Sequence, residues 1–196
     1  MNTMVKSCNG ITMVPMEARL LEDRKIFLEG EINQQSAMEF VRQIMLLVKE
    51  DSRKPIDIMM NSPGGSINAG LVIYDVLQSL QTPVRMFCMG AAYSMGALLF
   101  AGGPKGSRFM LPNSELMLHE PLLGSRVGGN ASSIHSISES LMETRRKVNG
   151  ILAKHTGKTV EEIEEATRFD HYFSAEESVA FGLADRIVDF REMMEG

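Results

Sequence analysis

Short apolar segments alternate with amphipathic segments through the first half of the chain. The segments 25–28, 56–60 and 84–89 have the length and composition of strands. Apolar residues recur three or four positions apart over 36–49 and 66–80, which predicts a helix after each of the first two strands. These apolar positions are Met38, Val41, Met45 and Val48 in the first helix, and Ile67, Leu71, Tyr74 and Leu77 in the second. Repeated strand, turn and helix units predict an α/β fold with parallel strands, right-handed crossovers and a site at the carboxyl ends of the strands.

The second half contains one much longer helical segment. Residues 131–155 keep an approximate helical spacing of apolar side chains, and Thr156-Gly157 resembles a helix C-terminus. At 1.5 Å per residue this helix is about 37 Å long, which is more than a small domain needs. We expect it to project from the core and to pack against a neighbouring subunit. The alternative is a helix that lies along its own domain.

The remaining segments are shorter. Strands are expected at 109–111, 116–118 and 187–188. Two further helices are predicted by capping-box sequences at their starts, namely Thr159-x-x-Glu162 and Ser174-x-x-Glu177. Residues 1–14 show no sustained periodicity, which predicts a mobile tail or a short hairpin.

Composition argues against several classes of protein. A chain of 196 residues with 44% hydrophobic and 23% charged residues is typical of one globular domain. The net charge of −5, without a long basic run, argues against a nucleic-acid surface. Cys8 and Cys88 lie in a predicted tail and a predicted strand, so neither a disulfide framework nor a metal site is expected. No segment reaches the ~20 apolar residues of a membrane span, which predicts a cytoplasmic protein.

Ser94 lies where the predicted strand 84–89 turns into an apolar helix. At the first turn of that helix, its Oγ can face a cleft while the N–H of Met95 points to where an oxyanion would develop. The pattern Ala-x-Ser-x-Gly over 92–96 is related to the nucleophile elbow of serine hydrolases. The alternative is that Ser94 only caps the helix.

Gly64-Gly65 follows the strand 56–60, at the same predicted edge of the sheet as Ser94. The N–H groups of Gly65 and Met95 could therefore face one point as a two-donor oxyanion hole. A side chain at position 65 would block the approach of a substrate carbonyl, whereas glycine permits it. The alternative is an ordinary tight turn.

His119 and Asp170 are two further residues singled out by their positions. His119 ends the predicted strand 116–118, and Asp170 lies in a loop between ordered elements. Taken alone, a histidine at a strand end is usually a packing residue of the surface or core, and a loop aspartate is usually an ordinary solvated or turn residue. His119 becomes a stronger candidate because it ends a strand in a chain that already offers an exposed serine and a candidate oxyanion hole.

Five motifs, in order along residues 20–188, resemble those of the ClpP family of ATP-dependent serine peptidases. They are Asn61-Ser62-Pro63-Gly64-Gly65, Tyr93-Ser94-Met95-Gly96-Ala97, Leu111-Pro112-Asn113-Ser114 with His119-x-Pro121, Ala153-Lys154-His155-Thr156-Gly157, and Asp170 before Phe173-Ser174-Ala175-Glu176-Glu177. The resemblance implies a crotonase-like fold of repeated β-β-α units with a projecting handle helix. It also implies a flexible N-terminal axial segment at 1–18, a head domain at 19–123 and 157–196, and a handle at 124–156.

The resemblance also implies an activity and its residues. Ser94 would be the nucleophile, His119 the general base and acid, and Asp170 the group that orients the imidazole. Gly65 and Met95 match the oxyanion-hole positions. Four residues match a groove that docks the partner ATPase, namely Met59, Phe87, Met89 and Phe109.

The family assembly gives further expectations. Two rings of seven subunits would stack through their handles, and a Clp/Hsp100 ATPase of the ClpX, ClpA or ClpC kind would feed unfolded proteins into the chamber. The peptidase itself would need no cofactor and no metal, because the partner uses the ATP. No nucleic acid and no membrane are expected as partners.

Several residues depart from the family pattern. Tyr93 stands where alanine is expected and would narrow the substrate site, and Glu120 replaces a glutamine and would act on His119 if it lies close. Phe169 replaces an arginine that couples the rings, for which Arg168 could substitute. The docking groove is altered at Asp57, Met59 and Ser79, where aromatic residues are usual.

These departures suggest a divergent paralogue that assembles with, or alternates with, a second ClpP-like chain. Two alternatives to an active peptidase follow. One is a weakly active structural subunit of a mixed ring. The other is a crotonase-type acyl-CoA enzyme that uses the oxyanion hole without a serine nucleophile.

Overall fold

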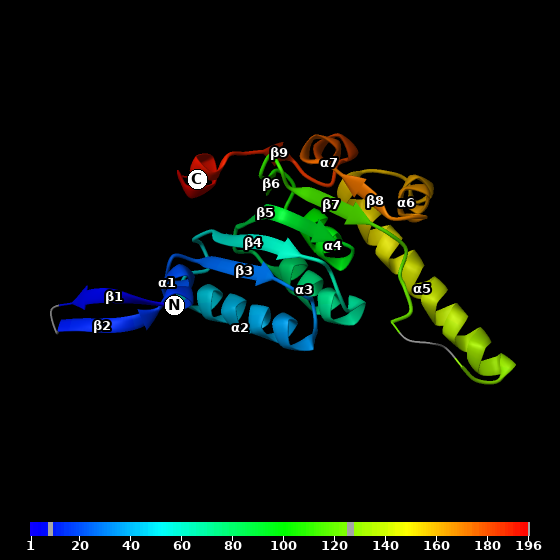
Figure 1. Cartoon of the computed structure of the whole chain (residues 1–196), viewed down its shortest axis with the longest axis horizontal. Coiled ribbons are helices and arrows are strands. Elements are labelled where there is room, and N and C mark those ends of the chain that lie inside the picture. Colours follow the sequence, from blue (N-terminus) through cyan, green and yellow to red (C-terminus); the bar gives the residue numbers. More distant parts are fainter. Residues whose placement is uncertain (8–9, 125–127, 196) are drawn as a thin grey trace.

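The structure is a computed structural model that describes residues 1–7, 10–124 and 128–195. Within these residues a seven-stranded sheet forms the centre of the molecule, and its main path runs in the order β3-β4-β5-β6-β9 (Figure 1). These strands are parallel, and they are β3 (Lys25–Glu29), β4 (Ile56–Ser62), β5 (Val84–Tyr93), β6 (Arg108–Met110) and β9 (Arg186–Ile187). β7 (Glu115–Leu118) pairs in parallel with the end of β5 and antiparallel with β8 (His171–Phe173). The predicted α/β fold with parallel strands is confirmed.

Three helices cover one face of this sheet (Figure 1). They are α2 (Gln34–Glu50), α3 (Ile67–Ser79) and α4 (Met95–Ala101). Every residue of α4 is buried, and alternate residues of β4 and β5 pack towards it, among them Ile58, Met60, Met86 and Cys88. Burial raises the pKa of the Cys88 thiol to about 12, so this cysteine acts as a small core residue. Cys8, the other cysteine, lies outside the described residues.

The buried face of α2 differs from the predicted one. Met38 and Met45 are 42% and 67% exposed, whereas Phe40, Ile44 and Leu47 are buried. Both sets of residues have helical spacing, so periodicity alone could not choose between them. Packing against the sheet and α3 selects the Phe40 side and leaves the methionines at the surface.

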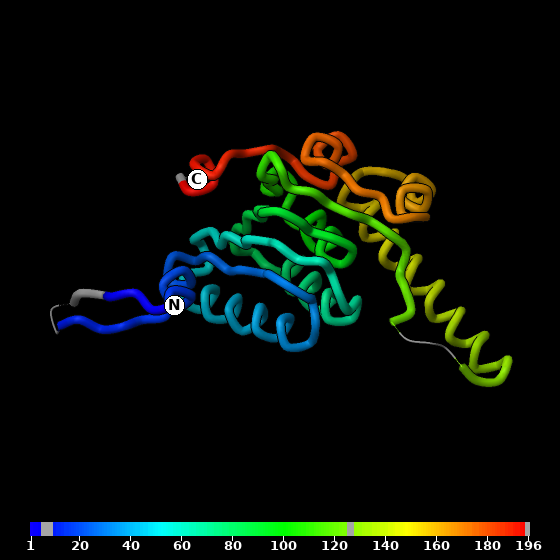
Figure 2. The backbone as a smooth tube through the Cα atoms, in the orientation of Figure 1, coloured from blue at the N-terminus to red at the C-terminus, as the bar shows by residue number. Residues whose placement is uncertain are grey.

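The N-terminal residues form a hairpin. β1 (Asn2–Ser7) and β2 (Gly10–Pro15) pair antiparallel, and α1 (Met16–Glu22) follows them directly. The hairpin points away from the sheet, on the opposite side of the molecule from the free end of the long helix (Figure 2). Of the two forms expected for this segment, the structure has the hairpin. The first helix, which begins inside the expected tail 1–18, was not predicted.

The long helix α5 (Ala131–Thr156) leaves the body of the molecule (Figure 1). Its buried residues are confined to its last third, at Val148, Asn149 and Leu152. Gly157 ends it in a left-handed conformation, as its sequence predicts. The helix therefore projects, and the alternative in which it lies along its own domain does not hold.

The C-terminal region adds three short helices. α6 (Val160–Thr167) and α7 (Ala175–Phe181) both begin with the predicted capping boxes. α8 (Phe190–Glu195) follows β9 and was not predicted. Of the helices in the described part of the chain, none combines the length and the apolar character needed to cross a bilayer.

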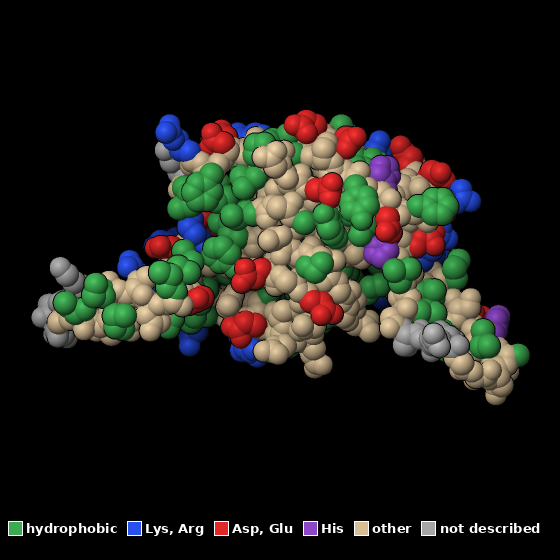
Figure 3. Space-filling view, viewed as in Figure 1, with side chains coloured by type: hydrophobic (Ala, Val, Ile, Leu, Met, Phe, Trp, Pro, Cys, Tyr) green, Lys and Arg blue, Asp and Glu red, His purple; other side chains and the backbone are tan. Residues whose placement is uncertain are grey.

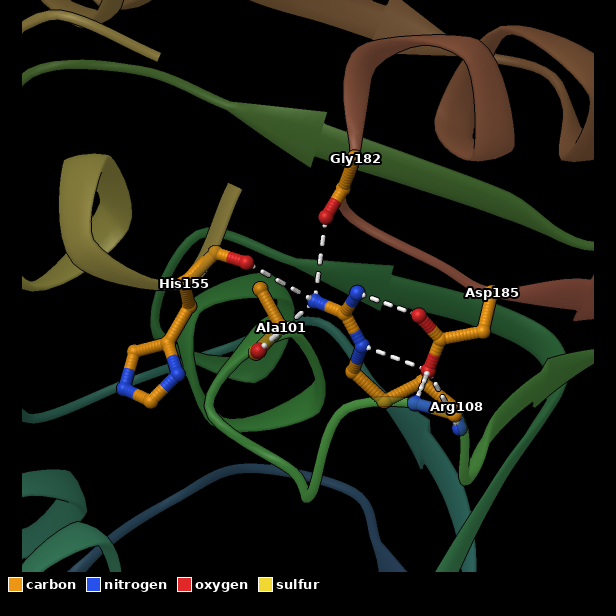
Figure 4. A network of polar contacts seen from close by, with 6 residues as sticks. Ala101, Arg108, His155, Gly182 and Asp185 are labelled. Carbon is orange, nitrogen blue, oxygen red and sulfur yellow. Dashed lines mark hydrogen bonds and ion pairs between the residues drawn. The ribbon is translucent and has the colours of Figure 1, made fainter. Parts of the chain in front are cut away.

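Arg108 ties the C-terminal ends of three helices together. It is 2% exposed and binds the carboxylate of Asp185 through Nε at 2.9 Å and Nη2 at 2.6 Å (Figure 4). Its Nη1 donates to the carbonyls of Ala101, His155 and Gly182, at the ends of α4, α5 and α7. Helix C-termini carry partial negative charge, so one buried cation is satisfied by three helices and one carboxylate.

Candidate active site

Ser94 forms the corner between β5 and α4. Its φ of 54° and ψ of −116° are unusual for a residue with a side chain, and such backbone strain is concentrated at functional sites. The corner is held by the Ser94 N–H, which donates to the Met117 carbonyl at 2.8 Å, and by Leu98, whose N–H donates to the Ser94 carbonyl. The side chain makes no helix-capping hydrogen bond. The capping alternative therefore does not hold.

His119 lies beside this corner because of strand pairing. β7 runs parallel to β5 with Met117 opposite Tyr93, so the residue just beyond β7 falls next to Ser94. Nε2 of His119 is 2.8 Å from Oγ of Ser94, which is hydrogen-bond distance. When Nε2 accepts from the hydroxyl, the proton of a neutral imidazole resides on Nδ1.

Asp170 faces that second nitrogen. It directly precedes β8, whose pairing with β7 sets His171 opposite Leu118. Oδ1 of Asp170 is 3.9 Å from Nδ1 of His119, and the aspartate side chain is 64% exposed. This distance is longer than a hydrogen bond. The structure thus brings the three predicted residues together, with the serine and histidine in contact and the aspartate more loosely placed.

The glycine turn after β4 packs directly against the Ser94 corner. A Cβ at Gly64 would lie 2.6 Å from the Tyr93 carbonyl and 2.9 Å from the Ser94 Cβ, and the φ of Gly64 is 92°. This position therefore requires glycine. The close approach places the next residue, Gly65, in the same cleft as Ser94.

Gly65 is required for a different reason from the one expected. A Cβ there would collide with the carbonyl of Ile32, rather than with a substrate, and the φ of Gly65 is 148°. The bridge to Ile32 uses the Gly64 carbonyl and the Ser66 N–H, so the N–H of Gly65 stays outside it. The N–H of Met95 belongs to the first residue of α4, where helix donors have no partner within the helix.

A cleft of about 700 Å³ lies over these groups. Ser94, His119 and Gly65 line it, together with Pro121 to Leu123 and the side of α5 that carries Leu141 and Thr144. A smaller pocket beside Ser94 is lined mainly by apolar side chains, and they are Ile67, Met95, Leu98, Leu118, Pro121, Val148 and Leu152. The larger cleft therefore gives a substrate access to Ser94 and His119, and the apolar recess beside them is small, at about 20 Å³.

Tyr93 does not narrow this cleft, contrary to expectation. Its hydroxyl donates to Oε1 of Glu115 at 2.7 Å, and its ring packs edge-on against Tyr172. The hydrogen bond to Glu115, together with burial and the charge of that carboxylate, raises the pKa of Tyr93 to about 12. Successive side chains of a strand point to opposite sides, which turns Tyr93 away from the cleft.

Glu120 follows His119 but is paired elsewhere. Its carboxylate lies 3.0 Å from Nη2 of Arg145 on α5. Arg145 was missed by the sequence analysis. The signal was present, because Arg145 continues the stripe of Ile137, Leu141 and Val148, and a cation on an apolar stripe needs a partner.

The four predicted groove residues share the outer face of the sheet. Met59 and Phe87 are buried under Val188 and Met193, and Met89 and Phe109 pack against them. The C-terminal helix α8, which carries Met193, therefore covers part of the expected groove. Phe27 on β3 and Phe190 and Met194 on α8 are exposed. Hydrophobic side chains gather around the C-terminal end of the chain in Figure 3.

No group of three or more histidine, cysteine, aspartate or glutamate side chains suited to a metal ion occurs among the residues that the structure describes.

Comparison with known families agrees with this architecture. The sequence model of the Clp protease family matches residues 9–191. The chain belongs to the Clp protease family. The parallel sheet, the helices on its face and the projecting α5 form a ClpP-like fold. Family membership supports a ClpP-type serine peptidase as the general class of this protein.

Proposed function

We propose that this Clp protease family member is a serine endopeptidase that hydrolyses peptide bonds of unfolded proteins. The observation that carries the proposal is the 2.8 Å contact between Ser94 Oγ and His119 Nε2, two residues that line a cleft of about 700 Å³. A serine hydroxyl is a weak nucleophile unless a base lies within hydrogen-bond reach. This contact supplies that base.

The proposed reaction assigns a role to each of these residues. His119 takes the proton of Ser94 as Oγ attacks the peptide carbonyl, and the resulting oxyanion is bound by the N–H groups of Gly65 and Met95. The imidazolium then protonates the leaving amine, which leaves an acyl-enzyme on Ser94. Water, deprotonated by His119, releases the second product. Asp170 stabilises the imidazolium from the Nδ1 side.

We further propose that the chain works in a ring chamber fed by a Clp/Hsp100 ATPase, without a cofactor or metal of its own. Exposed apolar side chains support self-association, because contiguous patches of them are typical of protein contacts. Met38, Met45 and Leu46 on α2 and Ile134 and Met142 on α5 are of this kind. The ATPase would bind over the outer sheet face at the margin of α8.

A second candidate function is a weakly active structural subunit in a mixed ring with another ClpP-like chain. The 3.9 Å separation and high exposure of Asp170 favour it, because the imidazole is then poorly oriented. Phe169 beside it is 78% exposed and carries no charge for a ring contact.

Active-site labelling tests these functions. A fluorophosphonate or β-lactone probe is expected to modify the full-length protein at Ser94 and to leave Ser94→Ala unlabelled. Cleavage of a fluorogenic peptide is expected to fall by at least about 1,000-fold in Ser94→Ala. Labelling with very slow peptide cleavage would identify the structural subunit. Absence of label, with acyl-CoA turnover that Ser94→Ala preserves, would identify the crotonase-type enzyme and contradict the peptidase.

A further inference from the structure

The segment that carries the candidate base has little support from the sheet. The pairing of β7 with β5 and β8 ends at Met117 and Leu118. His119 and Glu120 therefore lie beyond the last paired residue of the strand. The strand ladder brings His119 to Ser94 but ends there, so contacts of the following residue also bear on how the imidazole is held 2.8 Å from Ser94.

An ion pair with α5 lies directly at this point. Glu120 Oε1 is 3.0 Å from Arg145 Nη2, and the Arg145 side chain is mostly buried. The same Nη2 is 3.8 Å from Glu164 on α6, so two carboxylates converge on one guanidinium. Arg145 Nε is buried without a hydrogen-bond partner in the described part of the chain. The cation therefore depends on these carboxylates, and Glu120 is the nearer of the two.

The pair also joins the two walls of the cleft. Pro121 to Leu123 form one wall just after Glu120, and Leu141 and Thr144 form the other just before Arg145. The ion pair thus links α5 to the residue next to His119.

We propose that Arg145 is a positioning residue, whose ion pair with Glu120 holds the segment carrying His119 against α5 and so keeps the imidazole aligned with Ser94. This inference rests on the proposed peptidase function. Arg145 touches neither the substrate nor the reacting atoms, and it acts through Glu120. Loss of alignment by about 1 Å can cost on the order of 100-fold in rate, even when the change lies outside the reacting groups.

The two carboxylates on Arg145 provide a matched test. In the full-length protein, Glu120→Gln and Arg145→Gln are expected to lower kcat for a fluorogenic peptide by about 10- to 100-fold while KM changes less than about twofold. Glu164→Gln removes the other carboxylate, and Arg146→Gln removes an exposed neighbouring cation of α5. Both controls are expected to keep kcat. The rate of Ser94 labelling should fall in parallel with kcat.

Charge reversal provides a second arm that does not depend on the single variants. Glu120→Arg combined with Arg145→Glu restores the pair in the opposite sense and is expected to recover most of the activity that either single reversal loses. Equal losses in Glu120→Gln and Glu164→Gln would overturn the inference, since a purely structural role would use both carboxylates. So would a double reversal no better than the singles. Failure of the proposed function looks different, because the unaltered protein then neither labels at Ser94 nor cleaves peptide.

Discussion

At the scale of single residues, backbone geometry decides what the site can contain. Ser94 adopts a positive φ that side chains avoid, and Gly64 and Gly65 allow the neighbouring turn to approach it. The strain is offset by two backbone hydrogen bonds, one that the Ser94 N–H donates to β7 and one that the Ser94 carbonyl accepts from α4. The nucleophile is thus placed by its surroundings rather than by its own preference.

Gly65→Ala is expected to destabilise the protein by about 1–3 kcal/mol or more, because the added Cβ meets the Ile32 carbonyl at a φ unfavourable for alanine. Gly150→Ala is the control. This glycine lies exposed in α5 with open space where a Cβ would be added, so alanine should raise stability by up to about 1 kcal/mol. Urea unfolding of both variants measures the difference, and equal stabilities would contradict the collision.

The buried pair of Arg108 and Asp185 predicts a pH dependence. Burial by itself raises the pKa of the Asp185 carboxyl, but the hydrogen bonds and charge of Arg108 outweigh it and hold this pKa below its ordinary value. The carboxylate therefore stabilises the fold above its unfolded pKa of about 4. That stability is lost as the pH falls from there through the lower folded pKa.

Asp185→Asn is accordingly expected to cost about 3–5 kcal/mol near neutral pH, because it leaves the Arg108 cation buried without its counter-charge. The deficit relative to the unaltered protein should shrink as the pH falls below about 4. Thermal unfolding from pH 3 to pH 7 measures it. A deficit that stays constant over this range would show that the carboxylate charge is unimportant.

At the scale of elements, two helices from the second half of the chain, α5 and α8, cover different parts of the molecule. α5 carries one wall of the cleft, and its polar contacts reach the segment after β7. α8 covers the outer sheet face through Met193, in a small cluster separate from the main core. A helix of six residues held by one buried side chain has low local stability.

Met193→Ala is expected to release α8 and expose Met59 and Phe87, since a buried methionine contributes about 2–5 kcal/mol. Binding of the dye ANS should rise while the main unfolding transition stays near its original temperature. Met194→Ala is the matched control, because its side chain is already exposed. Equal dye binding by the two variants would mean that α8 does not depend on Met193.

At the scale of the whole molecule, apolar surface remains after the chain has folded. Part of it lies on α2, where Met38 and Met45 belong to the apolar stripe that does not pack against the sheet and face outwards. The first two thirds of α5 have no buried residue within their own chain. Surface of this kind is stabilised when a second copy covers it.

Met45→Glu is therefore expected to weaken ring assembly, because a carboxylate would be buried at the contact. Native mass spectrometry should show a large ring particle for the unaltered protein and smaller species for the variant. Gln81→Glu adds the same charge at an exposed loop residue and should assemble normally. Identical spectra for the two variants would exclude α2 from the contact.

Local features were predictable from the sequence. The strand and helix units, the capping boxes of α6 and α7 and the left-handed Gly157 depend on residues within a few positions of each other. Ser94 and His119 were also accessible in this way, since each follows the carboxyl end of a strand. Parallel strands bring such ends to one edge of a sheet. Asp170 precedes the antiparallel strand β8, and its role was expected only from the family resemblance.

Tertiary structure decided everything that depends on partners far away in the chain. Examples are the face of α2 that is buried, the pairing of Glu120 with Arg145 and the burial of Met59 beneath α8. Each depends on contacts between segments far apart in the sequence, and the sequence pattern is compatible with several such contacts. A helical stripe specifies a spacing, but not which of two equivalent stripes is buried, and a charge does not specify its counter-charge. The sequence by itself determined which elements form and where the reactive side chains stand on them, whereas only long-range packing determined what each of them contacts.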